Sequence, residues 1–216
     1  MPMNASGQRG IRLVSRWLCA LIFASASSHA TSVRQMNVVD LLAHSDTIVS
    51  GQVEKVTDGF APGGVPYTEV TLRVMDTIRG DKAATYTFRQ FGLDKPRTMP
   101  DRRVYLGGRP TGWPTWRKNE VALVFLYPKA RQTGLQTTVG LGYGKVSVGN
   151  GVALNGYDNT GLFQNIKVNR GLLDSAEADM FATKRGPVDA ETLRKFLHRA
   201  VEGKWVQTGR ISNAKR

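Results

Sequence analysis

Alternating apolar and polar positions occupy the middle of the chain and predict strands. Residues 67–79 alternate strictly, as expected for a strand with one buried face. Residues 46–57 are rich in β-branched side chains, and residues 85–91 repeat the alternation. Residues 121–127 are apolar at every position, which predicts a central strand covered on both faces.

A glycine-rich stretch follows the central strand. Residues 137–148 also alternate, but the apolar phase switches between Tyr143 and Val146, which predicts a bulge near Gly144. The glycines between the apolar residues permit the close backbone approach found in small barrels. Residues 58–66 contain several glycines and prolines, so we expect a turn there.

Two segments have helical spacing of their apolar residues. Residues 37–44 predict a short helix with Asn37 as N-cap. Residues 190–202 predict an amphipathic helix that begins after Asp189 and stops at Gly203. This second helix is expected to dock on the sheet.

These elements predict a mainly β (α+β) fold: a small antiparallel barrel with a short N-terminal helix and a C-terminal amphipathic helix. A single domain is expected over residues 31–207. Residues 157–187 show no regular pattern, and residues 208–216 predict a polar basic tail that frays. Eight apolar residues are expected to share one core: Val70, Leu72, Val74, Val121, Leu123, Phe125, Leu193 and Leu197.

Residues 1–30 have the order of a secretory signal peptide. Three arginines precede an apolar run over residues 17–26, and small residues follow it, which predicts cleavage after Ala30, with Ala26 as the alternative. The run is shorter than the roughly 20 residues that span a bilayer. We therefore expect an exported protein, periplasmic or secreted, that is not integral to the membrane. Cleavage would remove Cys19, the sole cysteine, so no internal disulfide is expected.

The composition of the chain limits the kinds of function that it can have. The chain has 216 residues, 41% hydrophobic, and a formal net charge of +13, so it can bury an ordinary core and presents a basic surface. Without the signal peptide it has two histidines, His44 and His198, and no cysteine. Few side chains are therefore available as the base or the nucleophile of nucleophilic catalysis. No metal-ligand spacing is present. We expect no cofactor, no metal site and no enzyme activity, and a hydrolase is the least favoured interpretation.

One basic stretch, residues 92–119, has tryptophans interleaved with its cations. Cations beside exposed aromatic rings are the groups that bind an anionic glycan or single-stranded nucleic acid. The alternative interpretation is a long connector whose tryptophans cover the core, and we favour it. The candidate binding residues are Arg102, Arg103, Arg109, Trp113, Trp116, Arg117 and Lys118.

A series of short segments resembles a widespread group of uncharacterised exported bacterial proteins. The order of the segments carries the resemblance, since each one alone is a weak motif. They are residues 45–53, 67–80, 119–127, 144–146, 159–163 and 193–201.

The first two predicted strands also resemble, distantly, the netrin-like OB-type barrel of the tissue inhibitors of metalloproteinases. This resemblance implies a small antiparallel barrel flanked by helices. Those inhibitors present an N-terminal cysteine to the protease zinc, whereas this chain after cleavage would begin at Thr31 and contain no cysteine. The function expected is a non-catalytic exported macromolecule-binding module. A protein partner is favoured, with a secreted protease as one candidate, and an anionic polymer bound through residues 92–119 is the alternative.

Overall fold

The computed structural model describes residues 34–99, 102, 104–105 and 111–214. The chain divides into two units, Met1–Ser32 and Val33–Arg216, and only the second contains described residues. The predicted signal peptide and both cleavage positions therefore lie outside the described residues. No helix in the described ranges is long and apolar enough to cross a membrane.

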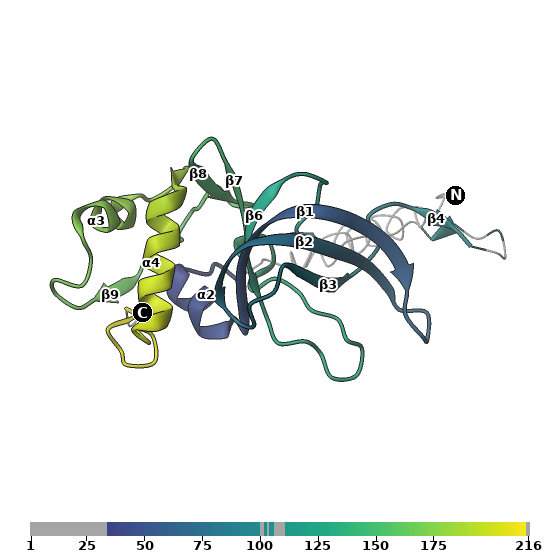
Figure 1. Ribbon diagram of the computed structural model, residues 1–216, viewed down its shortest axis with the longest axis horizontal. Coiled ribbons are helices and arrows are strands. Elements are labelled where there is room, and N and C mark those ends of the chain that lie inside the picture. Colours follow the sequence, from purple (N-terminus) through teal and green to yellow (C-terminus); the bar gives the residue numbers. More distant parts are fainter. Residues whose placement is uncertain (1–33, 100–101, 103, 106–110, 215–216) are drawn as a thin grey trace, which may run out of the picture. The chain divides into compact units, whose positions relative to one another are not determined.

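A seven-stranded antiparallel sheet organises this unit (Figure 1), in the order β10-β8-β7-β6-β1-β2-β3. The mainly β prediction is therefore confirmed. The strands are β1 (Thr47–Phe60), β2 (Pro66–Arg79), β3 (Thr85–Phe91), β6 (Val121–Leu126), β7 (Lys145–Gly149), β8 (Val152–Asn155) and β10 (Val188–Asp189).

Shorter elements surround this sheet. Two small ladders pair β4 with β5 and β9 with β11. The remaining elements are α2 (Val38–His44), α3 (Ser175–Ala182), α4 (Ala190–Glu202), the 3-10 turn η1 (Leu141–Tyr143), β4 (Arg97–Thr98), β5 (Val104–Tyr105), β9 (Ile166–Val168) and β11 (Ile211–Asn213).

The sheet is open, so it does not close into the predicted OB-like barrel. Its order runs from an edge at β10 to an edge at β3, and no ladder joins these edges in the described chain. Three register shifts in β1 bend the long β1–β2 pair, which curves visibly in Figure 1.

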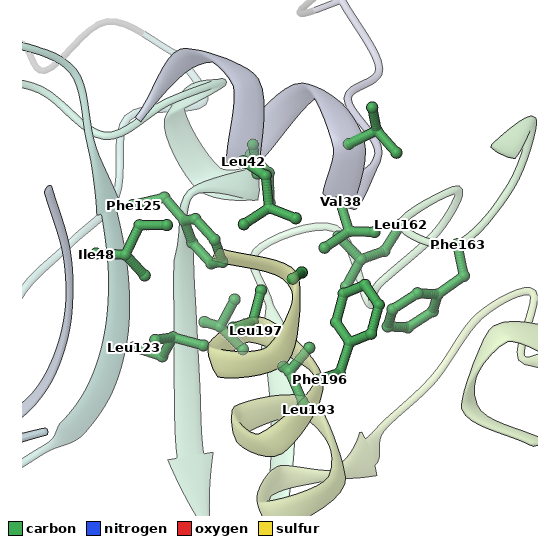
Figure 2. Packing of buried hydrophobic residues seen from close by; sticks show 14 of the residues in the cluster. Val38, Leu42, Ile48, Leu123, Phe125, Leu162, Phe163, Leu193, Phe196 and Leu197 are labelled. Atoms are coloured by element: carbon green, nitrogen blue, oxygen red, sulfur yellow. The ribbon is translucent and has the colours of Figure 1, made fainter. Parts of the chain in front are cut away.

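Two hydrophobic clusters lie on the two faces of β6, so the prediction of one core is also wrong. Leu123 and Phe125 pack with Leu193 and Leu197 of α4 and with residues of α2 (Figure 2). The alternate β6 residues belong to a second cluster that includes Val70, Leu72, Phe88 and Trp116, whereas Val74 and Val121 are only half-buried. A strand that is apolar at every position supplies both faces with side chains.

Both helices that the sequence predicted are present, with their caps. Asn37 begins α2 in a capping box with Asp40. Asp189 begins α4 by accepting a hydrogen bond from the Thr192 amide, and Gly203 ends the helix. Residues 67–79 and 85–91 form β2 and β3 as predicted.

Three predictions about irregular segments fail. Residues 137–148 are not one bulged strand: η1 interrupts them, and at Gly144 a Cβ atom would lie 2.3 Å from the Val139 carbonyl oxygen. Residues 157–187 contain β9 and α3. Residues 208–214 are not a frayed tail, because β11 pairs with β9 and Ile211 is fully buried. The domain therefore extends beyond residue 207.

Candidate functional site

The structure describes five of the seven predicted binding residues. Arg103 and Arg109 lie outside the described residues. Arg102, Arg117 and Lys118 are exposed, Trp113 is half-buried and Trp116 is buried. The two tryptophans therefore have different roles, which the sequence could not distinguish.

Trp116 belongs to the core. Its side chain is 4% exposed, and its indole Nε1 donates a hydrogen bond to Gln90 Oε1 at 2.9 Å. Its ring meets Phe88 edge to face, with centroids 5.3 Å apart. A ring held in this way cannot stack on a polymer base or sugar without unfolding its surroundings.

The first half of the basic stretch folds against the end of β1. The Arg97 guanidinium donates to the Asp58 carbonyl oxygen at 3.2 Å and lies 5.8 Å from the centre of the Phe60 ring. The Asp58 carboxylate accepts hydrogen bonds from the Asp94 and Lys95 amides. These contacts support the connector interpretation for residues 94–97.

Trp113 lines a cleft of about 360 Å³ between the basic stretch and the strands β7 and β8. Its lining includes the segment 112–115, called here the strap, together with Leu154 and Tyr157. The lining is mostly apolar, with a few polar side chains such as Asn155 among it. Size and composition both match small binding pockets in proteins.

The strap is held by hydrogen bonds along its length. The Gly142 amide donates to the Gly112 carbonyl at 3.0 Å, and the Gln90 side-chain amide donates to the Pro114 carbonyl at 3.2 Å. The Lys145 ammonium donates to the Thr115 carbonyl. Because the backbone is fixed at three points, the cleft exists before any ligand arrives.

Lys145 is the cation of the cleft lining, and it is neutralised within the protein. Its side chain is buried, and its Nζ lies 2.7 Å from Glu120 Oε1 and 4.7 Å from the centre of the Trp116 ring. Glu120 also accepts a hydrogen bond from the Arg117 amide at 2.8 Å. Lys145 therefore holds the strap against β7, and little net positive charge remains there for a ligand to bind.

Two polar atoms at the cleft residues have no hydrogen-bond partner. The Asn155 Nδ2 and Tyr157 hydroxyl are both buried and unpaired. The Tyr157 ring stacks on Tyr143, with centroids 4.2 Å apart, and burial raises the pKa of both phenols. Asn155 is held by its Oδ1, which accepts hydrogen bonds from the Tyr157 and Asn159 amides. A buried donor without a partner costs free energy that a bound acceptor would recover.

His198, on α4, contacts acidic side chains of β2 and of α4. His198 Nε2 lies 2.7 Å from Asp76 Oδ2, and its Nδ1 lies 3.8 Å from Glu202 Oε1. Arg194 also contacts Asp76, at 3.2 Å. Burial opposes ionisation of Asp76, but the hydrogen bonds from His198 and Arg194 outweigh it and lower its pKa. This cluster joins β2 to α4, so His198 is paired rather than solvated.

The sequence indicated Trp113 but missed other residues that line the same cleft. Lys145, Asn155 and Tyr157 lie 30 or more residues further along, in segments whose pattern predicted only strands and turns. Across the described ranges, no group of three or more His, Cys, Asp or Glu residues could hold a metal ion. Comparison with protein-family models, curated proteins and solved structures found no match for this chain.

Proposed function

We propose that this chain is an exported, non-catalytic binding module whose cleft receives an apolar side chain of a protein partner. One observation carries the proposal: a preformed, mostly apolar cleft has Trp113 in its wall, and its lysine is already paired with Glu120. Half-buried aromatic side chains in preformed pockets are typical anchors of protein interfaces.

The same geometry favours a protein over an anionic polymer. A polyanion site needs unpaired cations beside accessible rings, but Trp116 is buried, and Arg97 and Lys145 are engaged within the protein. The exposed Arg102, Arg117 and Lys118 provide positive charge without a second accessible tryptophan. Binding to a polymer is therefore the competing outcome of the experiment below.

The resemblance to the inhibitors of metalloproteinases makes a secreted protease the first partner to test. The absence of a cysteine after residue 19 means that any such contact would use apolar packing and hydrogen bonds instead of an N-terminal cysteine presented to the zinc.

The test compares partner retention by two forms of the exported protein. The wild type and Trp113→Ala, each immobilised, are exposed to the periplasmic extract or culture medium of the host. Bound proteins are identified, and each is then measured in purified form. Lys195→Ala, which alters an exposed α4 residue, is the matched control. We expect at least one purified partner whose affinity falls tenfold or more in Trp113→Ala alone.

Equal affinity of every partner for the wild type and Trp113→Ala would overturn the proposal. So would salt-sensitive binding of heparin or a single-stranded oligonucleotide that is lost in Arg117→Ala, because counterion release is the signature of a polyanion site.

A further inference from the structure

We infer that Asn150 is a site of spontaneous deamidation, at which the side-chain carboxamide becomes a carboxylate, and that the fold protects Asn155 from the same reaction. Each of these asparagines precedes a glycine, in the pairs Asn150–Gly151 and Asn155–Gly156. Both pairs have the same reacting groups, so the structure around each pair decides which of them reacts. The inference is independent of the proposed function.

The reaction joins a backbone nitrogen to the side chain of the residue before it. The Gly151 amide nitrogen attacks Asn150 Cγ, the bond between Cγ and Nδ2 breaks, and Nδ2 leaves as ammonia with the proton of the amide. Water then opens the imide ring that results. Opening at Cγ yields aspartate, and opening at the main-chain carbonyl of residue 150 yields isoaspartate. A glycine after the asparagine favours the attack, because it has no Cβ and its backbone rotates freely.

The nucleophile at Asn150 is accessible. Asn150 and Gly151 form the exposed turn between β7 and β8 (Figure 1), and their φ angles are 52° and 77°. Within the described part of the chain, no group accepts a hydrogen bond from the Gly151 amide, and a Cβ atom placed on Gly151 would meet nothing within 4 Å. The turn must open for the attack, and this costs little at the exposed end of a short hairpin.

The corresponding groups at Asn155 are held in place. Asn155 is 4% exposed, and its Oδ1 accepts hydrogen bonds from the Tyr157 and Asn159 amides, both at 2.9 Å. The Gly156 amide, which would be the nucleophile, donates to the Gly142 carbonyl at 3.0 Å. Attack on Asn155 Cγ requires these hydrogen bonds to break in a buried region, which costs free energy. The fold therefore suppresses the reaction at Asn155.

Isoaspartate at residue 150 would disturb the start of α4. The Gly151 carbonyl accepts a hydrogen bond from the Ala190 amide at 2.9 Å, and Val152 pairs with Asp189, the N-cap of α4. Isoaspartate adds one carbon to the main chain within a two-residue turn, where the turn geometry sets the pairing of the strands. The longer turn displaces Gly151 and weakens these contacts, whereas aspartate changes only an exposed side chain.

The experiment follows both asparagines in one peptide during incubation of the protein at mildly alkaline pH. Trypsin releases residues 146–167 as a single peptide, because no lysine or arginine lies between Lys145 and Lys167. Fragmentation of this peptide in a mass spectrometer then locates each converted residue. We expect conversion at Asn150 to be at least about tenfold faster than at Asn155 in the folded protein, and the two rates to be similar in urea.

Two variants separate the modification from its effect on stability. Asn150→Gly removes the carboxamide and tolerates the positive φ, so its melting temperature should not change during incubation. Asn150→Asp carries the new carboxylate on an unaltered main chain, so freshly purified it should melt like the wild type. We expect the incubated wild type to melt lower than either fresh protein, in proportion to its isoaspartate content.

An unconverted Asn150 in folded protein, under conditions that convert the urea-unfolded chain, would overturn the inference, because the turn would then be protective. Equal conversion of Asn150 and Asn155 in the folded protein would also overturn it, because the fold would then not discriminate between the pairs. A sample rich in isoaspartate at residue 150 that melts like the fresh wild type would refute the predicted effect on α4.

Discussion

Replacing Trp116 with alanine is the perturbation that most sharply separates the two interpretations of the basic stretch. The indole fills the space between Phe88 and Lys145 and donates a hydrogen bond to Gln90. Gln90 is itself fully buried, so the substitution leaves its Oε1 without that partner. The variant therefore loses packing, a hydrogen bond and a cation–π contact together.

The expected cost follows from these contacts. A buried Trp→Ala substitution costs about 3 to 5 kcal/mol through lost burial and the cavity left behind. A folded domain has a total stability of about 5 to 15 kcal/mol, so this loss is a large fraction of it. At about 2 to 4 °C per kcal/mol for a domain of this size, the melting temperature should fall by about 6 to 20 °C.

The assay is urea and thermal unfolding of the wild type, Trp116→Ala and Trp113→Ala. Trp113 is half-buried and contacts Phe91 at the surface, with ring centroids 6.3 Å apart, so its variant should lose about 1 kcal/mol or less. If Trp116→Ala changed the free energy of unfolding by under about 0.5 kcal/mol, as at ordinary surface sites, the assignment of Trp116 to the core would be wrong.

Further predictions concern the core, the C-terminal segment and acid stability. Leu123→Ala should cost about 2 to 5 kcal/mol in urea melts, whereas Val152→Ala, at an exposed position, should change little; similar losses would contradict the placement of β6. Ile211→Ala should lower the free energy of unfolding by a comparable amount, and the control Ser212→Ala should change it little. An equally small change in both variants would mean that residues 208–214 fray. Because the pKa of Asp76 is lowered below 3.8, its contribution to stability is present above that pH and is lost as the pH falls through the lowered pKa. Asp76→Asn should therefore flatten the loss of melting temperature as the pH falls below 3.8, and an unchanged slope would refute this.

Local patterns predicted the elements whose signals are local. The alternation over residues 67–79 and the caps Asp189 and Gly203 specify β2 and α4, because period and capping depend on a few neighbouring residues. The order of β-rich and helical segments likewise predicted the mainly β class. These features need no knowledge of the rest of the chain.

Long-range pairing explains the failures. The segment around Ile211 has the composition of a polar tail. Its one large apolar side chain is nevertheless buried, because β11 pairs with β9, which lies more than 40 residues earlier in the chain. The phase switch near Gly144 predicts a bulge, but a 3-10 turn produces the same switch. Barrel closure also depends on how both sheet edges meet, which no local pattern encodes.

Only part of the candidate site could be predicted, because its other residues meet through long-range pairing. Trp113 and Trp116 are separated by two residues in one basic stretch, and composition alone treats them as equivalent. Only the packing of Trp116 on Phe88 distinguishes a core residue from a cleft residue. Asn155 and Tyr157, which line the same cleft as Trp113, are brought to it by long-range pairing in the sheet and not by closeness in the sequence.

Site-specific photocrosslinking from the strap tests the central claim most directly. A benzophenone amino acid placed at Thr115, which is exposed and lines the cleft, should crosslink the protein to the proposed partner in an extract or the culture medium of the host. The same amino acid at Thr133, an exposed threonine outside the cleft lining, should not. The account predicts a Thr115 crosslink that disappears when Trp113→Ala is added. A partner that crosslinks equally from both positions, or whose Thr115 crosslink survives Trp113→Ala, would contradict it.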